Sequence, residues 1–212
     1  MTRLEAGARR SASERPNATP PALHEPALHE TDDSELVARC LRDDRQAFTE
    51  LVKRYKNAMV NYLTRLVGCR DRAEDFAQET FVRFYQSLDR YRHEGQLAAY
   101  LYRIATNLVR SHERRKRRFQ WLEPLLSRPG HHDETPQVAA LASERQEQVQ
   151  RAIAALDLHY RAPLVLREIE GRSYLEIAEA LGCSEGTVKS RLFRARQILK
   201  DKLTPFWNGQ TS

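Results

Sequence analysis

The sequence predicts an all-α protein with two small helical domains, a flexible linker between them and a helix-turn-helix near the C-terminus. From Ser34 onward, apolar residues recur at three- and four-residue steps, with almost no strand-like alternation. This helical pattern is interrupted over 119–135, where prolines, a glycine and polar residues gather. The 212 residues leave room for two domains, since ordinary domains have ~100–150 residues.

Residues 1–32 are expected to form a disordered N-terminal extension, because proline, alanine and charged residues there offer little apolar surface to bury. The extension contains a tandem repeat in which Pro-Ala-Leu-His-Glu occurs over 21–25 and again over 26–30. The expected order is an extension over 1–32, a first helical domain over 33–118, a linker over 119–135, a second helical domain over 136–203 and a tail over 204–212.

Helix boundaries follow from capping residues and breaks in the apolar pattern. The first domain is expected to contain helices over about 35–42, 45–67, 71–88 and 96–118. Gly68 should end the second of these as a C-cap, and Asp71 with Glu74 has capping-box spacing at the start of the third. The second domain should contain a helix after Pro136, one over about 158–169, and two closely spaced helices beyond.

Those last two helices predict a helix-turn-helix. Ser173 and Glu176 have capping-box spacing, and Gly182 ends the first helix after an apolar inward face. Ser184 then caps the second helix, which leaves a turn of about three residues, and the small Ala178 allows close helix packing. We expect this motif to read duplex DNA.

The second helix of the motif combines an apolar seam with a basic face. The seam consists of Val188, Leu192, Ala195 and Leu199 and should pack on the core. The candidate DNA-binding face consists of Lys189, Ser190, Arg191, Phe193, Arg194 and Arg196. Arginine can pair with guanine, serine with bases or phosphate, and phenylalanine with a thymine methyl group. A solvated basic helix is the alternative, although an exposed phenylalanine among cations does not suit it.

The helix expected over 71–88 has one apolar and one acidic or amidic side. The polar side contains Asp75, Gln78, Glu79, Val82 and Gln86. An exposed valine between carboxylates indicates a docking surface for another protein, and a solvated charged face is the alternative.

The helix expected over 96–118 shows a second stripe beside its buried face. The stripe consists of Tyr100, Arg103, Asn107, Arg110 and Arg114, and it continues into the basic run 114–118. An aromatic ring followed by cations suits single-stranded or melted DNA, whose bases can stack. A solvated basic helix end is the alternative.

Composition excludes several other classes. The net charge of +6 favours a polyanionic partner. Cys40, Cys69 and Cys183 form no C-x-x-C pair, so we expect reduced core residues and no metal site. We see no catalytic constellation, and we expect no enzymatic activity and no cofactor. Without an apolar run of membrane length or a secretory signal, membrane insertion is not expected and a cytoplasmic location is.

Over about 33–203 the chain resembles the bacterial RNA polymerase sigma factors of the extracytoplasmic-function (ECF) type, in the sigma-70 family. Three motifs carry the resemblance: DRAEDFAQETF at 71–81, YLYRIATN at 100–107, and GRSYLEIAEALG at 171–182 with GTVKSRLFRAR at 186–196. Departures are Tyr100, where the family usually has tryptophan, and Ser111, where aspartate is common. The N-terminal extension has no counterpart in the minimal family.

The resemblance implies two promoter-binding domains. The first would be sigma region 2, where Asp75, Gln78 and Glu79 match the motif that docks on the clamp helices of the largest polymerase subunit. The loop over 91–99 and the stripe on the helix expected over 96–118 would capture the minus-10 strand, with Asn107 at the floor of the loop. The second would be sigma region 4, whose basic face would read the minus-35 duplex.

The expected function is therefore to direct core RNA polymerase to specific promoters and initiate transcription. The expected partners are core polymerase, promoter DNA and an anti-sigma factor held between the domains. Two alternatives remain open. One is a stand-alone helix-turn-helix regulator that binds an operator without polymerase, commonly as a dimer. The other is a protein-interaction scaffold with solvated basic stripes.

Overall fold

Helices make up the regular structure of the part of the chain described here, which confirms the predicted all-α class. The computed structural model describes residues 32–91, 96–122 and 142–208. Its elements are α1 Asp33–Cys40, α2 Arg45–Val67, α3 Arg70–Gln86, the short 3-10 helix η1 Leu88–Arg90, α4 Leu97–Leu122, α5 Ala142–Ala154, α6 Leu158–Glu168, α7 Tyr174–Leu181 and α8 Glu185–Asn208. The extension 1–31 lies outside the described residues, so its predicted disorder stays a prediction.

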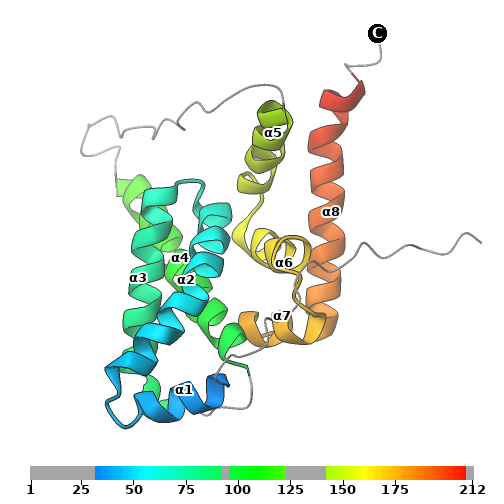
Figure 1. Cartoon of the computed structure of the whole chain (residues 1–212). Helices are drawn as coiled ribbons and strands as arrows, with labels where there is room; N and C mark the ends of the chain where they lie inside the picture. The colour runs from blue at the N-terminus through cyan, green and yellow to red at the C-terminus, as the bar shows by residue number, and fades with distance from the viewer. Residues whose placement is uncertain (1–31, 92–95, 123–141, 209–212) are drawn as a thin grey trace, which may run out of the picture.

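Helix α2 is the centre of an N-terminal group formed by α1–α4 (Figure 1). Its bounds agree with the sequence prediction, because both ends have strong caps. Asp44 Oδ1 accepts hydrogen bonds from the backbone N–H of Gln46 at 2.9 Å and of Ala47 at 3.2 Å. Gly68 ends the helix in the left-handed conformation, with φ of 73°.

Helix α3 starts differently from the prediction. Cys69 is its N-cap residue and makes no side-chain capping hydrogen bond, so the capping box predicted for Asp71 and Glu74 is wrong. Glu74 is instead bound by Arg70, whose Nε donates to Glu74 Oε1 at 3.0 Å. Because α3 starts at Arg70, Asp71 lies inside the first helical turn and not at the N-cap position.

Other helix bounds also shift. Helix α1 begins two residues earlier than predicted, at Asp33, where its carboxylate binds Arg54 and Tyr55 of α2. Helix α4 continues to Leu122, past the predicted end at 118, so the first residues assigned to the linker are helical. The remaining linker residues, 123–135, lie outside the described part of the chain.

The core of the N-terminal group contains a chain of hydroxyl groups among its apolar side chains. Tyr62 and Tyr102 are buried with their rings edge to face, 4.9 Å between centroids. The Tyr62 hydroxyl lies 2.7 Å from Thr106 Oγ1, which donates to the Tyr102 carbonyl at 2.7 Å. The hydroxyl groups of Tyr62 and Thr106 therefore each have a hydrogen-bond partner, as burial requires.

Helices α5–α8 form a C-terminal group in which α6 and α7 pack on α8. Val165 and Leu166 of α6 and Val188 and Leu192 of α8 are buried in one apolar cluster, which also includes the core of the N-terminal group. Ser173 and Gly182 fix the two ends of α7, as described below. The predicted helix-turn-helix is therefore present, as α7 and α8.

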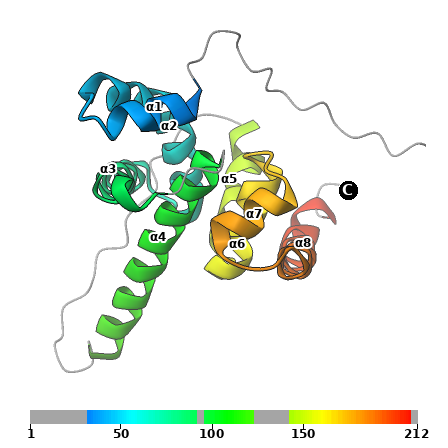
Figure 2. The ribbon, with the colours of Figure 1, turned by 90° about the horizontal axis from the view of Figure 1, so that it is seen from below.

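The two groups contact each other. Helix α4 packs against α7, while α2 packs against α5 and α6, and Figure 2 shows α4 and α7 side by side. The sequence analysis predicted a linker between domains but no contact between them. Among the described residues of the C-terminal group, polar side chains that cross this boundary include Arg161, Glu170 and Arg172.

The cysteines differ partly from the prediction. All three are free, but only Cys40 is buried. Cys69 and Cys183 are partly exposed because both lie at helix starts or turns and not on an inward helix face.

Candidate nucleic-acid interface

The helix-turn-helix is built by three capping interactions. Ser173 Oγ accepts from the Glu176 N–H at 3.2 Å, and Glu176 Oε2 accepts from the Ser173 N–H at 2.7 Å. Gly182 has φ of 61°, the left-handed conformation that permits the tight turn. Ser184 Oγ accepts from the Thr187 N–H at 3.2 Å and so caps α8. The predicted capping box, glycine turn and serine cap are all confirmed.

The inward and outward faces of α8 divide as the spacing predicts. Val188, Leu192 and Ala195 are buried, whereas Leu199, the fourth residue of the predicted seam, is half-buried. Phe193 lies on the outer face with 62% of its surface exposed. Single exposed apolar residues are common on protein surfaces, so Phe193 gains weight only from its place beside the exposed Arg194 on the outer face of α8.

The candidate minus-35 residues are all partly or fully exposed on α8, but the structure engages four of them with neighbours. Lys189 Nζ lies 5.8 Å from the Tyr174 ring centroid, Ser190 Oγ donates to the Thr187 carbonyl at 2.9 Å, and Arg191 Nη1 is 3.8 Å from Cys183 Sγ. In the described residues, Arg194 makes no hydrogen bond or ion pair. Phe193 and Arg194 are therefore the candidate minus-35 residues whose side chains are least engaged by the protein itself.

Arg196 has a structural partner that the sequence did not reveal. Its Nη2 and Nε donate to Glu168 Oε1 of α6 at 2.6 Å and 3.2 Å. The hydrogen bond to Glu168 raises the pKa of Arg196 above its ordinary value. Both side chains are about half exposed, so the pair orients Arg196 more than it stabilises the fold.

Tyr174 and Arg167 are contacts beside the motif that sequence reasoning missed. The Arg167 guanidinium lies 5.0 Å from the Tyr174 ring centroid, on the same residue that Lys189 approaches. Arg167 Nη1 also donates to the Arg172 carbonyl at 2.9 Å. Two cations thus share one aromatic ring at the start of α7. Their sequence separation gave no signal of this arrangement.

The stripe on α4 is present as one surface. Arg103, Asn107, Arg110 and Arg114 are exposed, and Tyr100 is half-buried. Arg110 Nη1 donates to Asn107 Oδ1 at 3.0 Å, so these two side chains are already oriented together. The helix therefore holds a continuous row of hydrogen-bonding and cationic groups.

Tyr100 belongs to an aromatic cluster at the N-terminal end of this row. The centroid of its ring lies 4.8 Å from that of Tyr91 and 6.2 Å from that of Phe84. Its hydroxyl donates to Ser87 Oγ at 3.1 Å. Burial, together with the charge of Asp33, raises the pKa of Tyr91 to about 12. The loop was predicted over 91–99; residues 92–95 lie outside the described part of the chain, and residues 97–99 belong to α4, so the loop prediction is wrong at its end.

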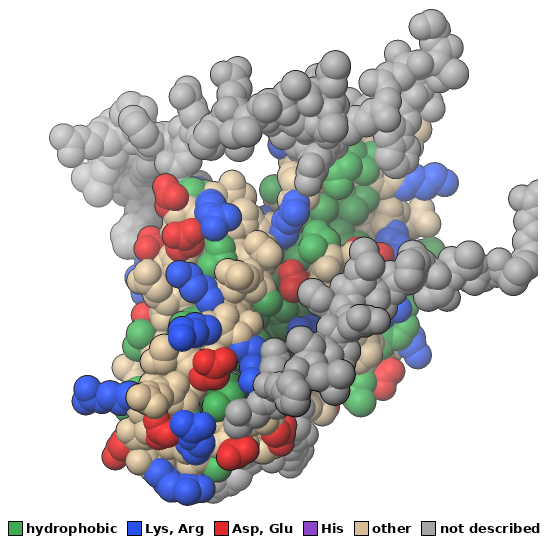
Figure 3. All heavy atoms as spheres, viewed as in Figure 1, with side chains coloured by type: hydrophobic (Ala, Val, Ile, Leu, Met, Phe, Trp, Pro, Cys, Tyr) green, Lys and Arg blue, Asp and Glu red, His purple; other side chains and the backbone are tan. Residues whose placement is uncertain are grey.

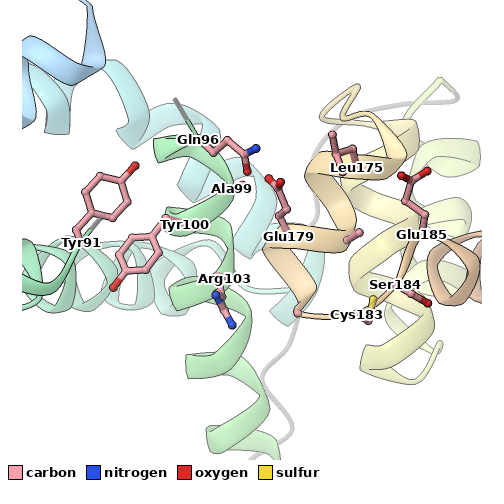
Figure 4. Close-up of a pocket in the computed structure, with 12 residues that line it drawn as sticks. Tyr91, Gln96, Ala99, Tyr100, Arg103, Leu175, Glu179, Cys183, Ser184 and Glu185 are labelled. Carbon is pink, nitrogen blue, oxygen red and sulfur yellow. The ribbon is translucent and has the colours of Figure 1, made fainter. Parts of the chain in front are cut away.

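A cleft of about 640 Å³ separates this end of α4 from the turn between α7 and α8. Tyr91, Tyr100 and Arg103 line one side, and Leu175, Glu179 and Cys183 line the other (Figure 4). Arg103 reaches toward the turn, since a Cβ added at Gly182 would lie 3.6 Å from Arg103 Nη2. Two residues of the predicted minus-10 surface, Tyr100 and Arg103, therefore line the cleft, whereas the predicted minus-35 residues of α8 do not.

The third candidate surface lies on α3. Asp75, Gln78 and Gln86 are exposed, and Val82 has 49% of its surface exposed. Glu79 is partly exposed and accepts from Arg83 Nε at 2.7 Å. Figure 3 shows charged side chains of both signs, with hydrophobic ones between them, over the α3 side of the molecule. Sequence reasoning missed Tyr85 on this helix, which is 46% exposed.

The described ranges show neither a metal-binding cluster nor a membrane-spanning helix. They contain no group of three or more histidine, cysteine or acidic side chains placed to hold a metal ion. None of the helices there is both long and apolar enough to cross a membrane.

Comparison with known proteins gives a consistent family. Residues 51–119 match the family model of sigma-70 region 2, and residues 146–199 match that of sigma-70, region 4. The chain is 35% identical to an ECF RNA polymerase sigma-E factor of Haemophilus influenzae over 82% of this chain and 96% of that protein. It is 34% identical to the RNA polymerase sigma-H factor of Pseudomonas aeruginosa, covering 84% and 97% of the two chains.

Solved structures agree with the sequence relatives. CnrH, solved in complex with the cytosolic domain of CnrY, has a TM-score of 0.63 and 26% identity over 82% of this chain and 99% of that chain. The sigma factor RpoE of Bartonella quintana, solved in complex with the anti-sigma factor NepR, has a TM-score of 0.61 and 25% identity over 74% and 96%. The chain therefore belongs to the sigma-70 family of RNA polymerase sigma factors, in its ECF group.

Proposed function

We propose that this protein directs core RNA polymerase to specific promoters and initiates transcription by binding two promoter elements. The observation that carries the proposal is the pairing of two different DNA-binding surfaces in one chain. Helix α8 presents an exposed phenylalanine and arginine at the position of a recognition helix, and α4 presents an aromatic and cationic row. These surfaces suit duplex and single-stranded DNA, respectively.

The C-terminal group, with proposed bounds 136–203, reads the minus-35 element as duplex. Phe193 and Arg194 contact base edges in the major groove, while Lys189, Ser190, Arg191 and Arg196 bind or position the phosphate backbone. The engagement of these four with protein neighbours supports this division, because Arg194 makes no hydrogen bond or ion pair among the described residues and is free to reach a base edge.

The N-terminal group, with proposed bounds 33–118, captures the minus-10 strand. Tyr100 offers a stacking ring, Asn107 an amide, and Arg103, Arg110 and Arg114 offer cations along the strand. Extruding a base costs a few kcal/mol, which stacking and hydrogen bonds to the flipped base must offset. Tyr100 replaces the family's usual tryptophan, and its hydroxyl bond to Ser87 holds the ring in place.

Core polymerase is the proposed docking partner of α3. Asp75, Gln78 and Glu79 match the family motif that contacts the clamp helices of the largest subunit. The exposure of Asp75 and Gln78, with Val82 between charged neighbours, suits a protein contact. An anti-sigma factor is a further proposed partner, because CnrH and RpoE were solved with CnrY and with an anti-sigma factor.

We further infer that the protein acts by binding alone, without catalytic activity or a cofactor, in the cytoplasm where its polymerase works. The sigma factor family is not an enzyme class, which supports the first inference. Promoter affinity would come from assembly, since two modest sites on one chain raise each other's effective concentration.

Transcription in vitro tests this proposal. The purified chain is mixed with core RNA polymerase and a promoter library, and specific transcripts are sequenced. We expect transcripts that depend on the chain and share two upstream elements. Operator binding without polymerase, with no dependent transcript, would favour a stand-alone regulator. The absence of salt-dependent DNA binding would favour a scaffold.

A further inference from the structure

We infer that Glu168 and Tyr174 are positioning residues for α8, and that they help it to discriminate the minus-35 element from other duplexes. The inference rests on the proposed function and deepens it, because it assigns the orientation of the α8 cations to two residues outside that helix. Glu168 is the last residue of α6, and Tyr174 is the first residue of α7. Neither is itself a candidate DNA contact.

Lys189 and Arg196 lie on the same flank of α8. They are seven residues apart, which is about two helical turns, so their side chains leave the helix in similar directions. Both are exposed, and Phe193 and Arg194 lie farther round the helix from the buried seam. When a recognition helix lies in the major groove, its flanks approach the phosphate backbones while its middle faces the base edges. These two cations therefore suit phosphate contacts that fix the register of α8 on the duplex.

Glu168 anchors Arg196 from the neighbouring helix. Arg196 Nη2 and Nε both donate to Glu168 Oε1, at 2.6 Å and 3.2 Å. A guanidinium held through two of its nitrogens has a defined plane, whereas an arginine without a partner is spread over many rotamers. The hydrogen bond to Glu168 raises the pKa of Arg196, and a hydrogen bond with Tyr174 acts in the same direction. Both anchors therefore act on this one guanidinium.

Tyr174 anchors cations through its ring as well. The Lys189 ammonium lies 5.8 Å from the ring centroid, and the Arg167 guanidinium lies 5.0 Å from it. The ring is partly buried and packs against the apolar core, so it is a fixed support for the cations around it. Side chains from α6, α7 and α8 thus converge on one ring at the edge of the candidate DNA-binding face.

Fixed cations favour one docking geometry over the others. On the matched duplex, Phe193 and Arg194 reach their bases only when the phosphate contacts hold α8 in the correct register. Because Lys189 and Arg196 are ordered before binding, part of the entropic cost of that geometry is already met. A duplex without the element is bound through phosphates in many registers, so it gains less from fixed side chains. Loosening the anchors should therefore weaken the matched complex more than the unmatched one.

A purely structural brace between α6 and α8 is the alternative. The Glu168 and Arg196 side chains are each about half exposed, and exposed ion pairs add little to stability. The alternatives differ in what they predict. Loss of a brace would lower Tm and leave discrimination between duplexes unchanged, whereas loss of a positioning residue would lower discrimination.

The test uses the chain bound to core RNA polymerase and two labelled duplexes. One is the promoter that the wild-type chain selects from the library, and the other is the same duplex with its minus-35 element scrambled. The ratio of their affinities, from fluorescence anisotropy, is the discrimination ratio. Glu168→Gln and Tyr174→Leu should each lower it by about 2- to 5-fold, the worth of an exposed ion pair or cation–π contact. Tyr174→Phe keeps the ring and should have a smaller effect.

A double-mutant cycle shows whether Glu168 acts through Arg196. In an Arg196→Ala background, Glu168→Gln should leave the ratio unchanged, because the group that it positions is gone. Glu185→Gln is the matched control. Glu185 is an exposed carboxylate in the first turn of α8 and forms no ion pair in the part of the chain described. Removal of its charge should shift the affinities for both duplexes together, so the ratio should not change.

Three results would overturn the inference. They are an unchanged ratio for Glu168→Gln, an equal effect of Glu168→Gln with and without the Arg196 side chain, and an equal fall for Glu185→Gln. Calorimetry checks that each variant folds, and the Glu168 cycle decides the matter alone if Tyr174→Leu unfolds. Failure of the proposed function is distinguishable, since the wild-type chain with core polymerase would then give no dependent transcript and bind both duplexes equally.

Discussion

Replacing Ser173 by alanine should loosen the start of the helix-turn-helix by a predictable amount. The side chain accepts one hydrogen bond, from the Glu176 N–H. The return bond, from the Ser173 backbone N–H to Glu176 Oε2, does not need the serine side chain and should survive. The variant thus loses half of the capping box.

The cost follows from that geometry. Loss of a serine cap destabilises a protein by about 0.5–2 kcal/mol, and the exposed position lets water replace the bond, so we expect about 1 kcal/mol. If the whole chain unfolds together, Tm should fall by about 2–4 °C; if the C-terminal group unfolds alone, the fall should be about 4–8 °C. The size of the shift therefore also reports whether the helical groups unfold as one unit.

Differential scanning calorimetry measures this shift. Ser173→Thr should recover most of the loss, since threonine also caps helices. Ser111→Ala is the matched control, because Ser111 is an exposed residue within α4 and alanine suits a helix interior. A Tm for Ser173→Ala that equals the wild-type value, or an equal fall for Ser111→Ala, would refute the assignment of the cap.

Three further predictions concern binding and pH. Arg194→Ala should lower transcription from promoters that need the minus-35 element by roughly 5- to 150-fold, the worth of one good base contact, while polymerase affinity stays unchanged in a binding assay; equal loss of polymerase binding would contradict the assignment. Asp75→Lys should weaken the complex with core polymerase in surface plasmon resonance, whereas Asp201→Lys on α8 should not, and equal affinities for both variants would exclude the α3 surface. Although burial opposes ionisation, hydrogen bonds from Ser173 and Arg172 hold the pKa of Glu176 below its ordinary value, so its stabilising effect is complete above that value and is lost as pH falls through the lowered pKa. Thermal melts of wild type and Glu176→Gln should therefore converge as the pH is lowered below the ordinary range of glutamate, and a constant difference would disprove this linkage.

Local sequence signals predicted the helices well where the cap is a short-range interaction. Gly68, Ser173, Gly182 and Ser184 act within three or four residues of themselves, so spacing alone located them. The same logic failed at Asp71, because Arg70 binds Glu74 and the helix starts earlier at a residue without a capping side chain. Propensity could not distinguish these two outcomes.

Contacts between distant segments were beyond sequence reasoning. Periodicity placed Phe193 and Arg194 on the outer face of α8, but it gave no information on the pairing of Arg196 with Glu168, which lies in another helix. It likewise assigned Tyr102 and Glu113 to no site, since their partners are Glu170 and Arg161 in the other helical group. Such pairs depend on how helices pack, and that packing is not encoded by the pattern of a single helix.

The hydroxyl chain in the core has a fixed direction, and this makes its two ends chemically unequal. Thr106 has a single proton and gives it to the Tyr102 carbonyl, so the Tyr62 hydroxyl must be the donor toward Thr106. Phenylalanine at position 62 would leave only a spare lone pair on Thr106, which is a mild defect. Valine at position 106 would leave the proton of Tyr62 without a partner at a fully buried position, which costs more. Position 106 is therefore the less replaceable of the two, although its side chain is the smaller one.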